Sequence, residues 1–117
     1  MTLVKELSTL AEFDRVLESS RNIPQLIFKH STSCPVSAAA FQEFLEFIKE
    51  HVNEDGLAFS LVKVIESRPV SNEIAARLTV RHESPQVILV QDGRAVWNES
   101  HHRIKKAELK QVAAELG

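Results

Sequence analysis

The sequence predicts an α/β domain with a mixed central sheet and helices on both faces of that sheet. Three observations lead to this fold class: short apolar runs alternate with amphipathic helical segments, a hairpin signal follows them, and a final amphipathic segment closes the chain. Alternating strands and helices favour parallel pairing through right-handed crossovers, and a hairpin adds antiparallel strands. We expect a single domain over residues 1–117, because this length suits one ordinary domain.

The first half of the chain carries two expected helices around a buried strand. Residues 8–20 predict a short helix, with Thr9 and Glu12 at capping-box spacing. Its expected apolar stripe is Leu10, Phe13, Val16 and Leu17. The run QLIFKH, residues 25–30, predicts a buried strand. A longer helix follows, and we expect it to end at the turn signal over residues 53–56.

The second half predicts a strand, a short helix, a hairpin and a terminal helix. Residues 57–67 are expected to form the strand, and Ser71 is expected to cap the helix that follows. The Asp-Gly pair at residues 92–93 is a hairpin signal between two strand-like runs. A helix over residues 105–117 has one apolar face, made of Leu109, Val112, Ala113 and Leu116. A weak additional strand is expected at residues 3–4.

The composition argues against several classes of partner. The 14 basic and 16 acidic side chains give a formal net charge of −2, so neither nucleic acid nor an anionic membrane is supported as a partner. No apolar run approaches the roughly 20 residues of a membrane span. The first residues lack the basic and apolar regions of a signal peptide, and the single cysteine excludes an intramolecular disulfide. We therefore expect a cytoplasmic protein in a reducing compartment.

The stretch HSTSCPVSAAAF contains the single cysteine, Cys34. Pro35 suits the first position of a helix, which makes Cys34 the expected N-cap after the strand. Free N–H groups and the positive end of the helix dipole would then face the sulfur and favour the thiolate, which is the nucleophile. The hydroxyls of Thr32, Ser33 and Ser37 can add hydrogen bonds. The alternative interpretation is that Cys34 is a small buried hydrophobe that only packs.

Pro85 opens an apolar strand in HESPQVILV, and the local sequence leaves the isomer of its peptide bond open. A cysteine at the start of the helix after a central strand, and a proline before the final hairpin, resemble the thioredoxin superfamily over nearly the whole chain. That resemblance implies a thioredoxin-like fold in which Pro85 is cis and packs against Cys34. It also implies that the Ser84 backbone pairs with an incoming thiol-bearing substrate.

The chain departs from the dithiol members of that superfamily at their second cysteine. Where those proteins have Cys-x-x-Cys, this one has Cys34-Pro35-Val36-Ser37. It therefore cannot hold an internal disulfide or act as a general dithiol reductase. Ser37 can donate a hydrogen bond to the sulfur but can do no redox chemistry.

HSTSCPVSAAAF followed by HESPQVILV is similar to a narrower family, the monothiol bacilliredoxins. The T-C-P-V-S or S-C-P-V-S core of that family is matched here by residues 33–37. The resemblance implies a thiol–disulfide oxidoreductase that removes bacillithiol from S-bacillithiolated proteins through Cys34. It implies bacillithiol as co-substrate, no tightly bound cofactor, and a separate bacillithiol disulfide reductase that recycles the small thiol. The implied substrate-binding residues around the catalytic cysteine are Thr32, Ser33, Pro35, Ser37, Ser84 and Pro85.

Two alternatives from other functional classes stay open. One is an iron–sulfur carrier that resembles the monothiol glutaredoxins. Those proteins have Gly and Phe after the cysteine, whereas this chain has Pro35 and Val36, which counts against this alternative. The other is a non-catalytic thioredoxin-like adaptor in which Cys34 is modified only as a redox marker.

The remaining features predict ordinary structure. Five histidines lack the spacing of metal ligands, so no metal site is expected. In a thioredoxin-like fold the loop with His82 approaches Cys34, where the ring could assist thiolate formation or touch substrate; an exposed loop histidine is the alternative. The run HHRIKK, residues 101–106, is expected to be a solvated helix start. Trp97 and the six phenylalanines are expected in the core.

Overall fold

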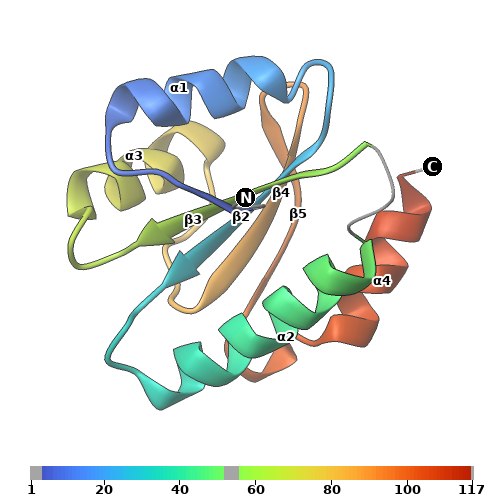
Figure 1. Ribbon diagram of the computed structural model, residues 1–117. Helices are drawn as coiled ribbons and strands as arrows, with labels where there is room; N and C mark the ends of the chain where they lie inside the picture. Colours follow the sequence, from blue (N-terminus) through green and yellow to red (C-terminus); the bar gives the residue numbers. More distant parts are fainter. Residues whose placement is uncertain (1–3, 52–55, 117) are drawn as a thin grey trace.

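The computed structural model describes residues 4–51 and 56–116 and shows a five-stranded sheet between two layers of helices (Figure 1). The strands lie in the order β1-β3-β2-β4-β5. Their bounds are Val4–Glu6, Gln25–His30, Ala58–Lys63, Gln86–Gln91 and Arg94–Ser100 for β1 to β5. β3 pairs in parallel with β1 and β2, whereas β4 runs antiparallel to β2 and β5. The predicted mixed sheet is confirmed.

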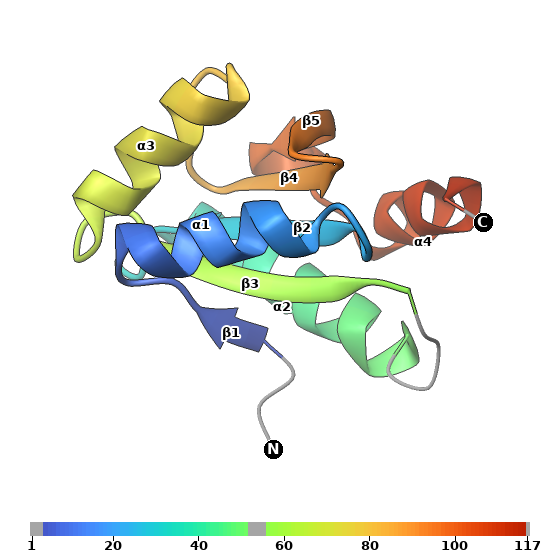
Figure 2. The same ribbon diagram turned by 90° about the horizontal axis from the view of Figure 1, so that it is seen from above.

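Two helices cover each face of the sheet (Figures 1 and 2). α1 (Leu10–Ser19) and α3 (Arg68–Leu78) lie on one face. α2 (Pro35–His51) and α4 (Lys106–Glu115) lie on the other, and a short 3₁₀ turn, η1 (His101–Arg103), precedes α4. The predicted order of the main elements is therefore confirmed. The run over residues 101–106 was predicted as a helix start. It begins instead with the turn η1, and α4 starts only at the last residue of the run, Lys106.

Helix α1 begins with the predicted capping box. The Glu12 N–H donates to Thr9 Oγ1 at 3.1 Å, and the Glu12 carboxylate accepts the Thr9 N–H at 3.0 Å. Phe13 and Val16 are buried as predicted. The predicted stripe is wrong at Leu10, whose side chain is 47% exposed. A side chain at the first helical position points back past the end of the helix and into solvent.

The start of α3 corrects another prediction. Ser71 is the predicted N-cap, yet it lies inside α3 and is buried, because the helix begins at Arg68. Pro69 explains the difference, since a proline is tolerated in the first turn of a helix, where its missing N–H has no partner to lose. Ser67 occupies the N-cap position without a side-chain capping bond. The strand predicted as far as Ser67 accordingly ends at Lys63, and a turn follows it.

Two further predicted boundaries fall at the edge of the described part of the chain. The weak first strand is present from Val4 onward, and residue 3 lies outside the described residues. The predicted end of the second helix over residues 53–56 also lies outside them, apart from Gly56.

The β4–β5 hairpin turns at Asp92 and Gly93, as predicted. Their φ angles are +54° and +75°, and two positive values are the signature of a type I′ turn, whose twist matches that of the flanking strands. The pairing register shifts once along the hairpin. This bulge allows Trp97 to pack with the α2–α4 layer and Ala95 to pack with the α1–α3 layer.

The sheet divides the hydrophobic core into two parts. Buried residues on the α1–α3 side include Phe13, Ile27, Val62, Ile74 and Ile88. Buried residues on the α2–α4 side include Phe28, Phe44, Phe47, Leu89 and Leu109. The predicted apolar face of α4 is confirmed, because its other three members also pack into this second part. Three aromatic residues predicted as core are only partly buried there: Phe41, Phe59 and Trp97.

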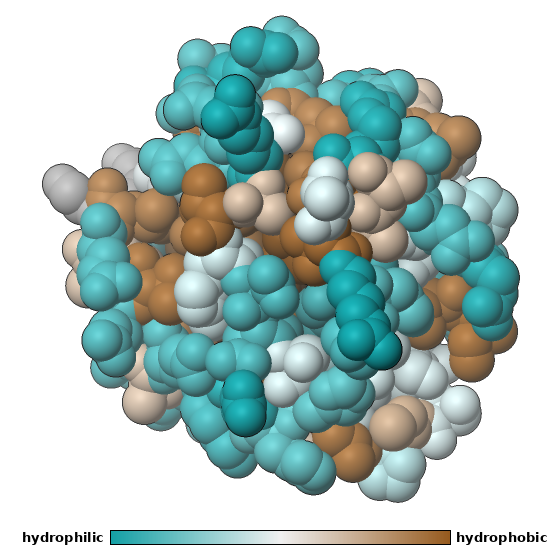
Figure 3. Space-filling view, turned by 180° about the vertical axis from the view of Figure 1, so that it is seen from behind, coloured by the Kyte–Doolittle hydropathy of each residue, from teal (hydrophilic) through white to brown (hydrophobic). Residues whose placement is uncertain are grey.

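The outer surface is mixed in character. The face seen from behind in Figure 3 is mostly hydrophilic, and apolar residues form separate patches on it. Among the residues that the structure describes, the exposed large apolar side chains are Leu10, Ile23, Ile65 and Val96. None of the helices in the described residues is long and apolar enough to cross a membrane.

Candidate functional site

Cys34 lies at the end of the loop between β2 and α2. Pro35 is the first residue of the helix, and the Cys34 carbonyl accepts the Ala38 N–H at 3.0 Å, which is the first hydrogen bond of the helix. The Cys34 N–H donates to the Ser31 carbonyl at 3.2 Å and so closes the turn. The predicted N-cap position of Cys34 is therefore confirmed. Cys34 is partly exposed, and its position places it at the free N–H groups and the positive end of the helix dipole.

Ser37 stands at the position of the second cysteine of dithiol proteins, and its side chain is fully buried. Its Oγ accepts the Ser31 N–H at 2.9 Å and lies 2.7 Å from His30 Nδ1. These two bonds tie the first turn of α2 back to the end of β2. The Ser37 hydroxyl is thus engaged within the fold and is not directed to the Cys34 sulfur, contrary to the possibility raised by the sequence.

The two other hydroxyls predicted near Cys34 lie on the outside of the same loop. Thr32 is exposed, and its Oγ1 donates to the Glu66 carboxylate at 3.4 Å, which links the loop to the turn after β3. Ser33 is exposed at the tip of the loop, next to the cysteine. Both side chains can therefore meet a molecule that approaches the sulfur, although the Thr32 bond goes to Glu66.

The sequence indicated no role for His30, which is one of the five histidines that lack the spacing of metal ligands. Its ring stacks on Phe41 with centroids 4.7 Å apart and meets the edge of Phe28 at 5.8 Å. Burial lowers the pKa of His30, an effect that Glu66 opposes and Lys63 reinforces. The ring is therefore neutral at neutral pH and can hold Ser37 without adding charge. The available signal for this contact was the seven-residue spacing between His30, at the end of β2, and Ser37, in the first turn of α2.

Ser84 and Pro85 lie at the same end of the sheet as the Cys34 loop. Lys29 pairs with Gln86 across β2 and β4, so Pro85 lies just beyond the point where β2 ends and that loop begins. The Ser84–Pro85 peptide bond is cis, and Pro85 is buried. The Pro85 carbonyl accepts the His101 N–H at 3.0 Å, which places η1 beside this segment. Ser84 Oγ is buried and has no hydrogen-bond partner among the described residues.

A polar cluster lies behind the segment that leads to Pro85; its members Lys29, Ser71 and Gln86 are buried, and most of it was not predicted from the sequence. Lys29 is 0% exposed, and its Nζ lies 3.1 Å from His82 Nδ1. Ser71 Oγ lies 3.5 Å from the same nitrogen. Gln86 Nε2 donates to the Arg81 carbonyl at 3.0 Å. The available signal was a lysine inside the apolar run QLIFKH, at a position that alternation places on a buried face.

The charges of this cluster are shifted by its burial. Desolvation lowers the pKa of Lys29 to about 8. It also lowers the pKa of His82, and the neighbouring Lys29 and Arg68 act in the same direction, whereas Glu83 opposes them. A neutral His82 ring can therefore accept a hydrogen bond from the Lys29 ammonium. The His82 side chain also reaches the surface, as the alternative of an exposed loop histidine required.

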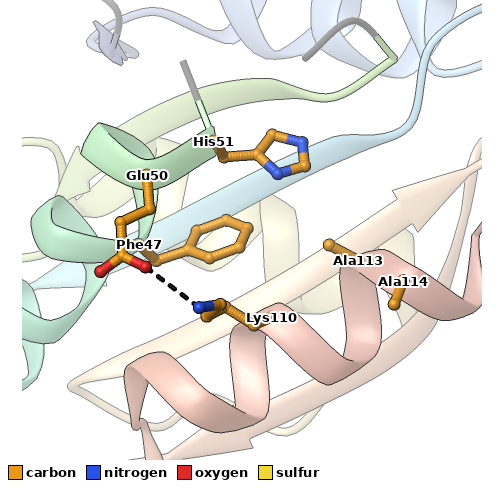
Figure 4. A pocket seen from close by; sticks show the side chains of 6 residues that line it. All are labelled: Phe47, Glu50, His51, Lys110, Ala113 and Ala114. Atoms are coloured by element: carbon orange, nitrogen blue, oxygen red, sulfur yellow. Dashed lines mark hydrogen bonds and ion pairs between the residues drawn. The ribbon is translucent and has the colours of Figure 1, made fainter. Parts of the chain in front are cut away.

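A pocket lies between α2 and α4, away from the thiol (Figure 4). It is lined by Phe47, Glu50, His51, Lys110, Ala113 and Ala114. Glu50 accepts hydrogen bonds from Lys106 at 2.7 Å and Lys110 at 3.0 Å. The pocket is at the C-terminal end of α2, whereas Cys34 precedes the first residue of that helix. In the described ranges, 4–51 and 56–116, no group of three or more potential ligands could hold a metal ion.

Comparison with known proteins agrees with this geometry. Residues 5–109 match the family described as Monothiol bacilliredoxin BrxC. A solved structure described as a proposed oxidoreductase with a thioredoxin fold is 32% identical, with a TM-score of 0.84 over 95% of this chain and 94% of that one.

Two thioredoxins share the fold at lower identity. Oxidized mitochondrial thioredoxin 3 from Saccharomyces cerevisiae is 17% identical, with a TM-score of 0.73 over 96% of this chain and 94% of that one. Thioredoxin from Fasciola hepatica is 16% identical, with a TM-score of 0.74 over 96% and 98% of the two chains. With the family match extending across the sheet, the thiol and the segment before β4, this chain belongs to the monothiol bacilliredoxin family and has a thioredoxin fold.

Proposed function

We propose that this protein is a thiol–disulfide oxidoreductase that removes bacillithiol from S-bacillithiolated proteins through Cys34. The observation that carries the proposal is the single cysteine, partly exposed at the N-terminus of α2. A serine stands one turn further along and the chain has one cysteine, so the sulfur has to act alone. The family match supports bacillithiol as the small thiol. We place the reaction in a reducing cytoplasm.

The first step is an exchange of one disulfide for another. The Cys34 thiolate attacks the bacillithiol sulfur of the mixed disulfide, and the bond between bacillithiol and the target protein breaks. The target's sulfur leaves as a thiolate and takes a proton from water. Bacillithiol is then held on Cys34 by a new disulfide, and the numbers of disulfides before and after the step are equal.

The second step needs another molecule of bacillithiol. Its thiolate attacks the bacillithiol sulfur held on Cys34, which releases the Cys34 thiolate and bacillithiol disulfide. A separate bacillithiol disulfide reductase supplies the two electrons that return this disulfide to free thiols. Bacillithiol is thus a co-substrate, and no tightly bound cofactor takes part.

Residues around the sulfur have separate parts in this proposal. The Ser84 backbone pairs with the chain that carries the mixed disulfide, and Pro85 forms the wall beside it. Thr32, Ser33 and Pro35 border the approach to Cys34. Ser37 contributes from inside, because its bonds hold the loop that carries the thiol.

The test begins with the reduced protein, bacillithiol disulfide and, in parallel, glutathione disulfide, with intact mass recorded over time. We expect a rapid single adduct with bacillithiol, which free bacillithiol removes and which the Cys34→Ala variant never forms. Equal rates with the two disulfides would contradict the choice of bacillithiol. Modification only after unfolding would contradict the role of Cys34 altogether.

A second measurement separates an enzyme from an adaptor. An S-bacillithiolated target protein is incubated with bacillithiol, with and without a catalytic amount of this protein. We expect the target to lose its adduct faster when the wild-type protein is present, and at the uncatalysed rate with Cys34→Ala. An adaptor would acquire the adduct and leave the rate for the target unchanged.

A further inference from the structure

Lys29 is the most unusual buried group in the described part of the protein. A lysine is almost never fully buried unless a carboxylate pairs with it. The side-chain partner of Lys29 is instead the His82 ring, and no acidic side chain of the described residues forms an ion pair with it. Lys29 lies two residues after Ile27 in β2, so both side chains face the α1–α3 layer. An apolar side chain at position 29 would continue the core there.

Three elements converge on the segment that carries His82. Lys29 reaches it from β2, and Ser71 reaches it from α3. Gln86, which pairs with Lys29 across the strands, binds the backbone carbonyl of Arg81. All of these bonds end on residues 81–82, which have no regular secondary structure and lie two and three residues before Ser84.

This convergence anchors a stretch that would otherwise have few contacts of its own. Arg81 and His82 are both exposed, so little apolar burial holds them in place. The polar bonds from beneath therefore help to decide where this stretch lies, between the buried Val80 and Pro85 that flank it. Because Ser84 follows within two residues, a change in the position of His82 moves the Ser84 backbone with it.

We propose that Lys29 is a positioning residue for thiol–disulfide exchange, because its hold on the His82 ring fixes the segment that presents the Ser84 backbone beside Cys34. The inference rests on the proposed function for the part that Ser84 plays. It assigns a part in the reaction to Lys29, which lies on the face of the sheet opposite α2 and does not touch the substrate.

The chemistry of the contact suits such a role. Lys29 has only protons to donate, and the neutral His82 ring accepts one of them at Nδ1 while its other nitrogen carries the ring proton. The charged groups that act on this ring are Lys29 from β2, Arg68 from α3 and Glu83 from its own segment. The contact is lost if the ring becomes protonated, since two cations would then face each other.

The test compares the rate of exchange with the rate of alkylation at the same thiol. The substrates are one cysteine peptide carrying bacillithiol and the same peptide carrying glutathione, both as mixed disulfides. Lys29→Met keeps the volume and removes the donor, and His82→Ala removes the acceptor. With whichever of the two peptides the wild type prefers, we expect both variants to exchange about tenfold more slowly than the wild type. Alkylation by iodoacetamide should keep its wild-type rate, because it needs no docked peptide.

Two control variants make the comparison specific. His82→Asn places an amide oxygen near the position of Nδ1, so it should restore most of the rate that His82→Ala loses. Lys63→Met removes a lysine from the end of the neighbouring strand β3, where it pairs with Glu6 at 3.5 Å, and should leave exchange unchanged. Combining Lys29→Met with His82→Ala should give no further loss, since both changes remove one contact.

The outcomes separate this inference from the proposed function. A wild-type protein that prefers the glutathione peptide overturns the choice of bacillithiol, while the ratio between variant and wild type still tests Lys29. Equal exchange rates for Lys29→Met and wild type overturn the positioning role. A parallel loss of exchange and alkylation also overturns it, because Lys29 would then act on the thiol or on the fold as a whole.

Discussion

Ser37 supports the thiol loop without serving the sulfur. Its oxygen accepts the Ser31 N–H and contacts the neutral His30 ring, both inside the protein. A buried backbone donor that loses its partner costs about 1–3 kcal/mol. Ser37 thus stabilises the connection between β2 and α2, and its chemical effect on Cys34 is indirect.

Ser37→Ala should therefore lower the free energy of unfolding by about 1–3 kcal/mol, because the Ser31 N–H and the His30 ring lose their partner. Urea denaturation followed by circular dichroism measures this change. Ser33→Ala is the matched control, since Ser33 is exposed and the change should stay within about 0.5 kcal/mol. Ser37→Ala should still form the bacillithiol adduct, and complete loss of adduct formation would show that the hydroxyl does act on the sulfur.

Lys29 makes a different demand on the fold, because its buried ammonium lowers stability. Burial lowers its pKa to about 8 from the ordinary 10.5. Between these two values the unfolded chain binds more protons than the folded one, so the free energy of unfolding should rise as pH increases. The increase from this one group is at most about 3 kcal/mol.

Lys29→Met should raise the free energy of unfolding at pH 7 by about 1–3 kcal/mol, because an apolar side chain replaces a buried charge. The rise between pH 8 and pH 10.5 should disappear in the variant. Urea denaturation at pH 7 and near pH 10 measures both effects. A variant that is more stable but slower in exchange would show that the lysine is kept for function; reduced stability at pH 7 would contradict the burial argument.

Residue positions were predictable where local chemistry alone decides them. Cys34 at the N-cap followed from the proline after it, whose fixed φ and missing N–H suit the start of a helix. The partners of Ser37 lie only six and seven residues away, but which polar groups it bonds depends on how the loop between β2 and α2 folds. The partner of Lys29 was not predictable, because it depends on which strands lie side by side. Lys29 meets His82 across 53 positions of sequence, and no local pattern links the two.

Among the elements, α4 is attached to α2 by one buried side and one charged side. Leu109 is 2% exposed in the core beneath α4. Glu43 of α2 accepts the Lys106 N–H at 2.8 Å and so satisfies a free donor at the start of α4. Glu50 binds Lys106 and Lys110 at the surface. Such exposed pairs contribute less than about 1 kcal/mol each, whereas burial contributes more.

Leu109→Ala should accordingly lower the free energy of unfolding by about 2–5 kcal/mol, because it leaves a cavity in the core. Glu50→Ala should lower it by less than about 1 kcal/mol, and added salt should reduce even that effect. Thermal and urea unfolding measure both. Comparable losses for the two variants would mean that the surface charges hold α4 in place.

The elements themselves were predictable in kind and order, and less so at their ends. The capping box at Thr9 and the Asp92-Gly93 turn carry their own conformational preferences, so both appeared where the sequence placed them. The start of α3 was missed because Ser71 resembles a cap, although Pro69 had already fixed an earlier start. The register shift in the hairpin was missed because alternation alone gives Ala95 and Trp97 the same face.

At the scale of the whole molecule, the sheet separates two groups of polar side chains at the end where Cys34 lies. On the α2 side lie the thiol, the His30 ring and Ser37. On the α3 side lies the polar cluster of Lys29 and His82. β2 supplies a residue to each side from consecutive positions, because successive side chains of a strand point to opposite faces. The sequence KH in QLIFKH therefore contributes to both groups at once.

Ser37 in place of a second cysteine also sets how long an adduct on Cys34 persists. No second thiol in the chain can displace a group bound to Cys34, since the sequence contains one cysteine. The lifetime of an adduct is then governed from outside, by the concentration of free small thiol. In a pool of this protein, adducts on Cys34 would therefore last longer when the reduced thiol is scarce. The fraction of chains carrying an adduct, read by mass, would record the recent supply of that thiol.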